Sequence, residues 1–237
     1  TSLLNASYGY LVLPESLPRE RRMPFSWRRA NPVGSLVLLR SHQELFGLAT
    51  ANFLAGTAHV VLPSVTVLYL SYRYGWGTSA IGLTLAAVGV CVMIVQGGLI
   101  KPITAWLGAR RTLLLGLLCG AVGFAIYGLA PTGPLYWSGI PVMAFWGLAG
   151  PAAQGLMTRR VGPSEQGQLQ GAIASLMGIA GMIGPILFTQ TFAIFIGPLA
   201  GWHLPGAPFL LASLVLLLAM GVGWRATTPE ENVAPGS

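Results

Sequence analysis

Polar residues interrupt the first long apolar stretch of the chain at a helical spacing. Asn52, Gly56, His59, Pro63 and Thr66 fall within roughly 80° of one another at 3.6 residues per turn. Hydrogen-bonding side chains are costly to bury in lipid, so inside a membrane segment they usually face a cavity or a neighbouring helix. We therefore predict that Asn52, His59 and Thr66 line a cavity.

His59 is the only side chain deep within an apolar stretch that titrates near neutral pH. An imidazole titrates near neutral pH, which makes His59 a candidate for a ligand contact or a proton carrier. A neutral histidine that hydrogen-bonds to a neighbouring helix is the alternative explanation.

Two glutamines are the other polar candidates for the cavity, Gln96 in the second apolar stretch and Gln154 in the fourth. Their amides can donate and accept hydrogen bonds to a ligand, although bonds between helices explain them equally well. Large apolar side chains could form a wall around a drug-like molecule, with packing or lipid contact as the ordinary role of each: Phe145, Trp146, Met182 and Phe192.

Enzymatic chemistry gets little support from the residue pattern. The apolar stretches hold no cluster of histidine with acidic residues, no nucleophile beside a base and no metal-ligand spacing. Cys91 and Cys119 lie within apolar runs, which favours small hydrophobic residues over a disulfide or a metal pair. We predict no catalytic residue, no metal and no cofactor.

The composition indicates which elements must position these side chains. Apolar residues make up 54% of the chain, charged residues 8%, and the mean hydropathy is +0.68, which a soluble domain could not accommodate on its surface. The apolar runs lack two-residue alternation, so helices rather than barrel strands are expected. We predict an all-α membrane protein with six transmembrane helices, at about 45–70, 79–100, 112–130, 135–157, 168–196 and 206–224.

Basic residues predict the orientation of these helices. Of the thirteen Lys and Arg residues, only Arg73 falls on the opposite side of the predicted membrane from the rest. The positive-inside rule places the other twelve in the cytoplasm, together with both ends of the chain. This topology explains the net charge of +7 without nucleic acid as a partner. Aromatic residues gather at the predicted outer ends, where rings favour the headgroup layer: Tyr69, Tyr72, Tyr74, Trp76, Tyr136, Trp137 and Trp202.

The apolar and polar segments predict four regions. Residues 1–14 are expected to be the end of a preceding transmembrane helix, and residues 15–44 a basic cytoplasmic loop between domains. Residues 45–224 form the six-helix bundle, and residues 225–237 a cytoplasmic tail.

The segment between the second and third predicted helices resembles the cytoplasmic loop signature of the major facilitator superfamily. It runs from Gly98 to Arg111, and its Gly108, Arg110 and Arg111 match the glycine turn followed by paired basic residues. The turn suits a glycine, and the arginines could dock on helix C-terminal carbonyls or acidic partners. The acidic residue of the family pattern is missing, with Ala105 near its place. A basic loop that only sets topology is the alternative.

A second match resembles the tetracycline/proton antiporter branch of this superfamily. It runs from Glu165-Gln166-Gly167-Gln168-Leu169-Gln170-Gly171 to Gly184-Pro185-Ile186-Leu187-Phe188-Thr189. Its glycines allow a neighbouring helix to approach closely and slide, and Pro185 removes a backbone hydrogen bond, although ordinary packing also explains them. The helix-packing or gating residues expected on this stripe are Gly167, Gly171, Gly178, Gly181, Gly184 and Pro185.

The resemblance implies the C-terminal half of a twelve-helix carrier that is completed by an N-terminal half. It implies proton-coupled efflux of a small hydrophobic or drug-like compound across the inner membrane. Where tetracycline antiporters have a membrane histidine and a membrane aspartate, the chain has Val92 and Gly120, and it contains no aspartate. Tetracycline itself is therefore a doubtful substrate. A facilitator that imports a metabolite and a non-transporting membrane scaffold are the alternatives.

Overall fold

The computed structural model describes Tyr8, residues 43–163 and residues 165–227, and the described residues form helices joined by short connections, with no strand among them. The predicted helix end over 1–14, most of the loop over 15–44 and most of the tail over 225–237 lie outside the described residues. The elements in chain order are α4 (Gln43–His59), α5 (Val61–Tyr74), α6 (Thr78–Ile94), the π-helix η2 (Val95–Leu99), α7 (Ile100–Leu129), α8 (Gly133–Ala144), the 3₁₀ helix η3 (Phe145–Leu148), α9 (Ala149–Thr158), α10 (Gln166–Ile196), the 3₁₀ helix η4 (Ala200–Trp202) and α11 (Ala207–Ala226).

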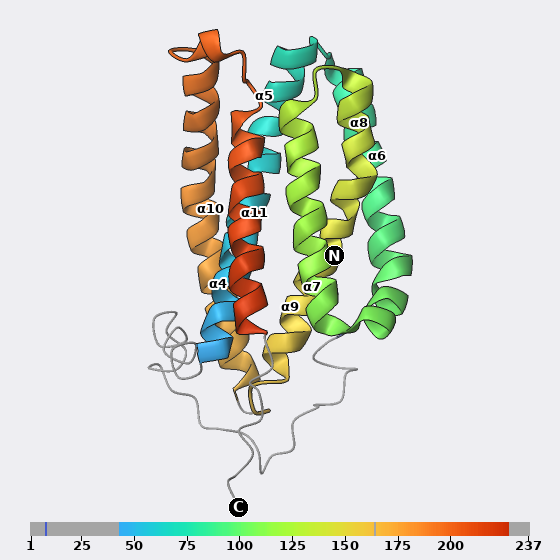
Figure 1. Cartoon of the computed structure of the whole chain (residues 1–237), viewed down its shortest axis with the longest axis vertical. Helices are drawn as coiled ribbons and strands as arrows, with labels where there is room; N and C mark the ends of the chain where they lie inside the picture. The colour runs from blue at the N-terminus through green and yellow to red at the C-terminus, as the bar shows by residue number, and fades with distance from the viewer. Residues whose placement is uncertain (1–7, 9–42, 164, 228–237) are drawn as a thin grey trace, which may run out of the picture.

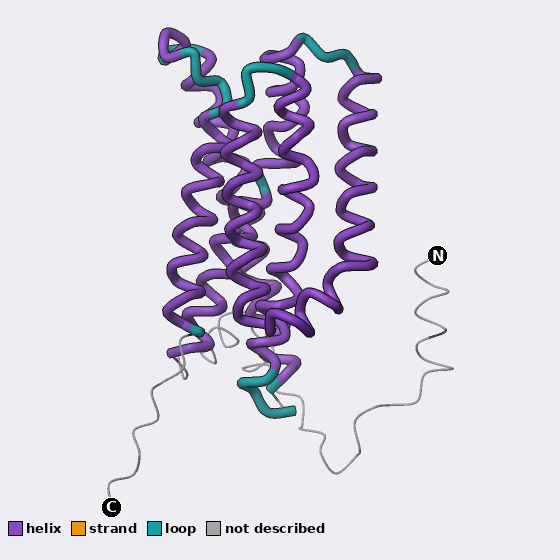
Figure 2. The backbone as a smooth tube through the Cα atoms, turned by 45° about the vertical axis from the view of Figure 1, so that its right-hand side comes forward, coloured by secondary structure: helices purple, strands orange, loops and turns teal. Residues whose placement is uncertain are grey.

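These elements run along one common direction, and their connections gather at the two ends of the bundle (Figure 1, Figure 2). Four helical stretches are long and apolar enough to cross a membrane: Leu45–Tyr74, Thr78–Leu129, Gln166–Ile196 and Ala207–Ala226. The all-α membrane class is therefore confirmed, whereas the number of six spans stays a prediction. The stretch from Gly133 to Thr158 is divided by η3, and the stretch from Thr78 reverses direction at Gly108.

The helix α11 lies at the centre of the bundle, where it packs most extensively against α4 and α7. Its Phe209, Ala212 and Leu216 are fully buried in the main apolar core. By contrast, α10 and α6 lie at opposite sides (Figure 1), and only a small share of their most apolar segments is buried. Exposed apolar surface of this extent suits contact with lipid or with further helices.

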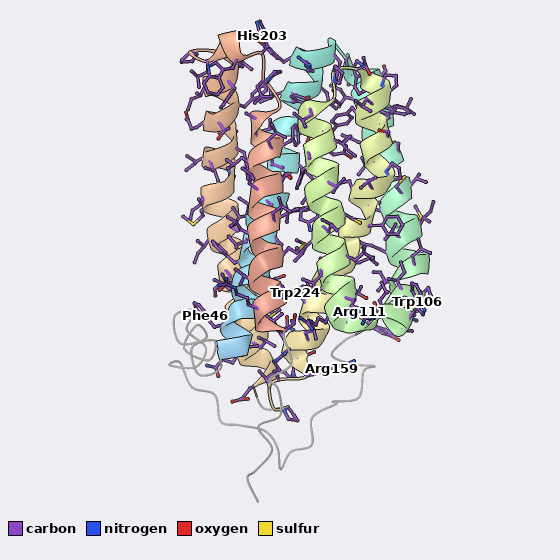
Figure 3. All side chains as sticks on the ribbon, in the orientation of Figure 1. Phe46, Trp106, Arg111, Arg159, His203 and Trp224 are labelled. Atoms are coloured by element: carbon purple, nitrogen blue, oxygen red, sulfur yellow. The ribbon has the colours of Figure 1, made fainter. Side chains whose placement is uncertain are left out.

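Charge separates the two ends of the bundle. Arg111 and Arg159 lie at the lower end in Figure 3, whereas His203 lies at the upper end. Within the described part of the chain the lower end also carries Lys101, Arg110, Arg160 and Arg225, and we call it the basic end.

Aromatic residues pack together at the opposite end. The Tyr69 hydroxyl donates to the Tyr127 carbonyl oxygen at 2.8 Å, and the Tyr74 hydroxyl donates to the Ala130 carbonyl oxygen at 2.8 Å. The rings of Tyr127 and Tyr136 stack at a centroid distance of 4.2 Å. Because Tyr69 and Tyr136 are fully buried, they hold the helix ends together instead of lying in a headgroup layer as we expected.

Candidate functional site: a cavity at three helix interruptions

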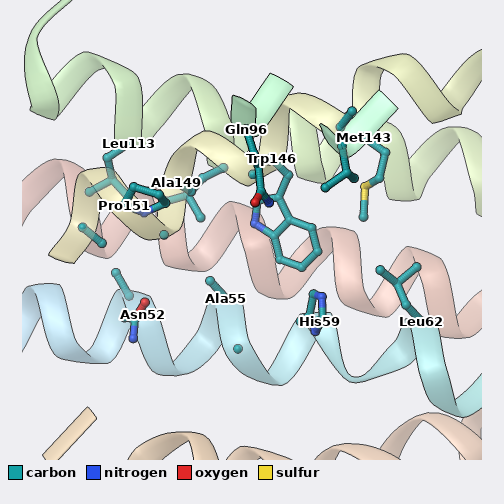
Figure 4. Close-up of a pocket in the computed structure, with 18 of the residues that line it drawn as sticks. Asn52, Ala55, His59, Leu62, Gln96, Leu113, Met143, Trp146, Ala149 and Pro151 are labelled. Atoms are coloured by element: carbon teal, nitrogen blue, oxygen red, sulfur yellow. The ribbon is translucent and has the colours of Figure 1, made fainter. Parts of the chain in front are cut away.

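A cavity of about 400 Å³ lies between α4, the α6–η2 segment, α7 and the α8–η3–α9 segment. Its size falls within the range of pockets for small molecules. Figure 4 shows Asn52 and His59 on one wall and Gln96 and Trp146 on the opposite wall. Three of these four residues lie at, or directly beside, an interruption of a helix.

The first interruption separates α4 from α5 at Val60, directly after His59. Pro63 explains it, because proline has no N–H to donate to the carbonyl oxygen of His59 four residues earlier. The Val60 amide instead donates to the Thr57 carbonyl oxygen at 3.1 Å. His59 thus ends its helix in an exposed position, with its ring 5.4 Å from that of Trp146.

The second interruption is the π-helix η2, which contains Gln96. Two consecutive glycines, Gly97 and Gly98, follow Gln96 and weaken the regular helix. Single π turns inside α-helices often occur at functional sites. The amide lies against Gly147, where an added Cβ would be 3.1 Å from Nε2 of Gln96.

The third interruption is the 3₁₀ helix η3, which carries Trp146. Pro151 cannot donate to the carbonyl oxygen of Gly147 four residues earlier, so the regular α pattern is lost at this point. Trp146 also packs edge-on against Phe124 with ring centroids 5.4 Å apart. The indole is thereby held between the core and the cavity.

The cavity combines an apolar lining with polar side chains that form no hydrogen bond within the described part of the chain. The described residues that line it include no Asp, Glu, Lys or Arg, and His59 is the only titratable residue among them. The side chains of His59 and Gln96 are exposed, and neither forms a hydrogen bond within the described part of the chain. Their hydrogen-bonding capacity is thus available to a ligand.

Two further cavities share lining residues with this one. One of about 570 Å³ is lined by Asn52, Pro151 and Gln154, among others, and one of about 430 Å³ by Pro151, Lys101 and Arg159. Pro151 lines all three cavities. The structure therefore brings Asn52, His59 and Gln96 onto the main cavity, and Gln154 onto a neighbouring cavity that Asn52 also lines.

Thr66 lines none of these three cavities. It is buried in α5, and its hydroxyl has no hydrogen-bond partner among the described residues. Of the four large apolar residues considered for the wall, only Trp146 lines the main cavity. Phe192 is buried in the core, whereas Met182 is 75% exposed on α10.

The residues of the loop signature lie at the basic end. Gly108 has φ 77° and reverses the chain between the first turns of α7 and its long apolar part. Nε of Arg110 donates to Oγ1 of Thr227 at 3.1 Å, and the guanidinium lies 4.9 Å from the ring centroid of Trp224. Arg110 thus docks on the end of α11 through a hydroxyl and a ring, and Arg111 is exposed.

Gly184 of the glycine stripe on α10 approaches a neighbouring helix closely. A Cβ added to Gly184 would lie 2.7 Å from Cβ of Val60, at the break between α4 and α5. Gly167, Gly178 and Gly181 are exposed and an added Cβ would meet nothing within 4 Å, whereas Gly171 and Pro185 are half-buried.

The two positions that depart from the antiporter pattern both lie near the cavity. Val92 is one of the residues that line it. A Cβ added to Gly120 would lie 2.8 Å from Cγ of Trp146. The indole therefore fills the space into which a larger side chain at position 120 would project.

Sequence comparisons place the chain among known membrane carriers. The model of the Major Facilitator Superfamily matches residues 1–185. The class C tetracycline resistance protein of Escherichia coli is 30% identical over 95% of the chain and 57% of its own length. The class G protein of Vibrio anguillarum is 32% identical over 78% of the chain and 48% of its own length. The human hippocampus abundant transcript-like protein 1 is 28% identical over 99% of the chain and 50% of its own length.

A solved structure agrees at the level of the fold. The crystal structure of the human organic anion transporter MFSD10 matches with a TM-score of 0.76, at 22% identity, over 93% of the chain and 55% of that protein. The chain spans about half the length of the curated relatives it matches. It belongs to the Major Facilitator Superfamily and is similar to the tetracycline-resistance branch of that family.

Proposed function

We propose that the chain forms the C-terminal half of a secondary active transporter that exports a small hydrophobic or drug-like compound in exchange for protons. The observation that carries this proposal is the cavity at the three helix interruptions. Substrate sites in secondary transporters are typically built where membrane helices are discontinuous, because the interrupted backbone and its neighbours can bind a ligand there. The apolar lining suits a hydrophobic compound, and Asn52, His59 and Gln96 supply hydrogen bonds that orient it.

The orientation follows from the basic end. Six of the seven Lys and Arg residues in the described part of the chain lie there, with Arg73 as the exception. By the positive-inside rule this end faces the cytoplasm of a cell with the carrier in its inner membrane. An exported compound would then enter the main cavity from this end of the bundle.

Proton coupling needs a group that binds and releases a proton within the membrane. His59 is the candidate in this half, because the cavity lining contains no carboxylate. An acidic residue in an N-terminal half would be the other member of the pair.

Everted membrane vesicles that contain the complete carrier test the proposal. We expect gradient-dependent accumulation of at least one of three probes, tetracycline, chloramphenicol or Hoechst 33342. Asn52→Leu and Gln96→Leu should each weaken it about two- to tenfold through one lost hydrogen bond. Met182→Leu, on an exposed face outside the cavity, is the matched control and should transport normally.

Three results would contradict the proposal. Accumulation of none of the probes above vesicles without the carrier would argue against drug efflux. Probe movement in the opposite direction would favour the importer. Equal transport by Asn52→Leu, Gln96→Leu and Met182→Leu would remove the cavity from the substrate path.

A further inference from the structure

A groove of about 430 Å³ at the basic end has a chemistry that differs from that of the main cavity. Its polar lining is Lys101, Thr104 and Arg159, and its apolar lining includes Ile100 and Ala152. Lys101 and Thr104 come from the first turns of α7, before the reversal at Gly108, and Arg159 follows α9. Two elements far apart in the sequence thus contribute one cation each to the same groove.

Arg159 is not needed to complete the end of its own helix. The neighbouring Arg160 donates from Nη1 to the Leu156 carbonyl oxygen at 3.2 Å, and Nε2 of Gln166 donates to the Thr158 carbonyl oxygen at 2.9 Å. Side chains other than Arg159 therefore donate hydrogen bonds to carbonyl oxygens at the C-terminus of α9. Arg159 is exposed, and its guanidinium is available to a ligand in the groove.

The groove offers two cations and a hydroxyl, and its described lining contains no acidic residue. An anion with several acceptor oxygens satisfies these donors best, since arginine binds phosphate through paired N–H groups and lysine binds it as a point charge. A free inorganic anion would leave the apolar side of the groove empty. A molecule with a phosphate at one end and a hydrocarbon chain at the other would cover both.

The level of the groove along the bundle agrees with this chemistry. Trp106 follows Ala105, a residue of the groove lining, and is 84% exposed at the basic end (Figure 3). Exposed tryptophan is typical of the headgroup layer of a membrane, where lipid phosphates also lie. Basic pockets between membrane helices at the cytoplasmic side are suited to anionic lipid headgroups.

We propose that the groove between Lys101 and Arg159 binds the headgroup phosphate of an anionic phospholipid. Both cations and the Thr104 hydroxyl bind the phosphate, and an acyl chain lies against Ile100 and Ala152. The site shares only Pro151 with the lining of the main cavity, and the proposal holds whether or not the main cavity transports a drug.

Native mass spectrometry of the purified protein in mild detergent tests the site with three probes: phosphatidylglycerol, phosphatidylcholine and inorganic phosphate. We expect phosphatidylglycerol to bind more tightly than phosphatidylcholine. In K101Q/R159Q this affinity should fall about thirtyfold, which follows from about 1 kcal/mol for each basic residue near a lipid phosphate. K101R/R159K keeps both charges and should retain most of the binding.

The matched control is R111Q/R225Q, which removes two exposed cations of the basic end outside the groove and leaves the same net charge as the test variant. It should keep phosphatidylglycerol binding within about twofold of the parent protein. Equal losses in the two double variants would overturn the proposal in favour of diffuse attraction. Equal binding of the two lipids would also overturn it, as would inorganic phosphate that displaces phosphatidylglycerol at equal concentration. If K101Q/R159Q does not elute with the parent protein in size exclusion, the lipid affinity of K101R/R159K decides. Loss of phosphatidylglycerol binding in that variant would overturn the proposal.

Discussion

Replacement of Gly184 by alanine should destabilise the bundle at the seam between α10 and the break in the first span. The new Cβ would lie 2.7 Å from Cβ of Val60 and 2.8 Å from its Cγ1, whereas ordinary contacts are 3.4–4 Å. Closing that shortfall needs a shift of about 1 Å, and overpacking of this kind costs about 1–3 kcal/mol. Val60 is bonded to His59, so the shift should also disturb the cavity wall.

Gly181→Ala is the matched control, because it adds the same methyl group to the same helix in open space. We expect its free energy of unfolding to stay within about 0.5 kcal/mol of the parent. The measurement is a dodecyl sulfate titration in mixed micelles, followed by far-ultraviolet circular dichroism. A Gly184→Ala protein as stable as the parent would refute the close contact between Gly184 and Val60. Equal destabilisation by Gly181→Ala would show that the effect does not come from this contact.

Three other substitutions or labels have defined expectations. Arg110→Ala should lower the free energy of unfolding by about 1–2 kcal/mol, because it removes the ring contact with α11 and one hydrogen bond. Arg111→Ala, at an exposed position, should change it little. Equal effects of the two substitutions would contradict the docking of Arg110 on α11. A cysteine at Pro163 should resist an impermeant thiol reagent applied outside intact cells, and one at His203 should react; the reverse pattern would invert the orientation. His59→Gln should lose proton-driven accumulation yet keep downhill exchange, since the amide hydrogen-bonds without titrating; normal accumulation would eliminate His59 as a proton carrier.

The helical membrane class could be predicted from the sequence because the bilayer leaves few solutions for long apolar runs without alternation. The family could be predicted because the motif from Glu165 to Thr189 is long and specific. The exact boundaries were less predictable. Helix α4 begins at Gln43 and α11 ends at Ala226, each two residues beyond the predicted limit.

The prediction of a polar stripe in the first span assumed one regular helix, and the structure contradicts that assumption. A helical wheel treats residues 45–70 as one regular helix, which places Thr66 in phase with Asn52 and His59. The break at Val60 ends that regularity, and Thr66 lies buried in α5, outside the cavity lining. Pro63 was visible in the sequence as a source of bending, but the direction of the bend depends on packing against α10 and α11.

Packing partners were the least predictable feature. The glycines of α10 indicated a face that another helix can approach, yet the sequence does not say which helix does so. Gly184 meets the break after α4 closely, whereas Gly178 and Gly181 are exposed and meet no other helix of the described chain. Likewise, the aromatic rings of Tyr69 and Tyr136 fitted a headgroup layer by position, whereas burial and mutual stacking dominate in the fold.

In the proposed carrier, the cavity at the three helix interruptions is an aqueous route for the transported compound. Single cysteines at Gln96 and Met182, introduced after replacement of Cys91 and Cys119, test it directly in everted vesicles with an impermeant methanethiosulfonate reagent. Both positions are exposed in this chain, but Gln96 lines the cavity and Met182 lies on the outer face of α10. We predict rapid modification at position 96, blocked transport after it, and no modification at position 182. Modification at position 182 but not at position 96 would contradict the account.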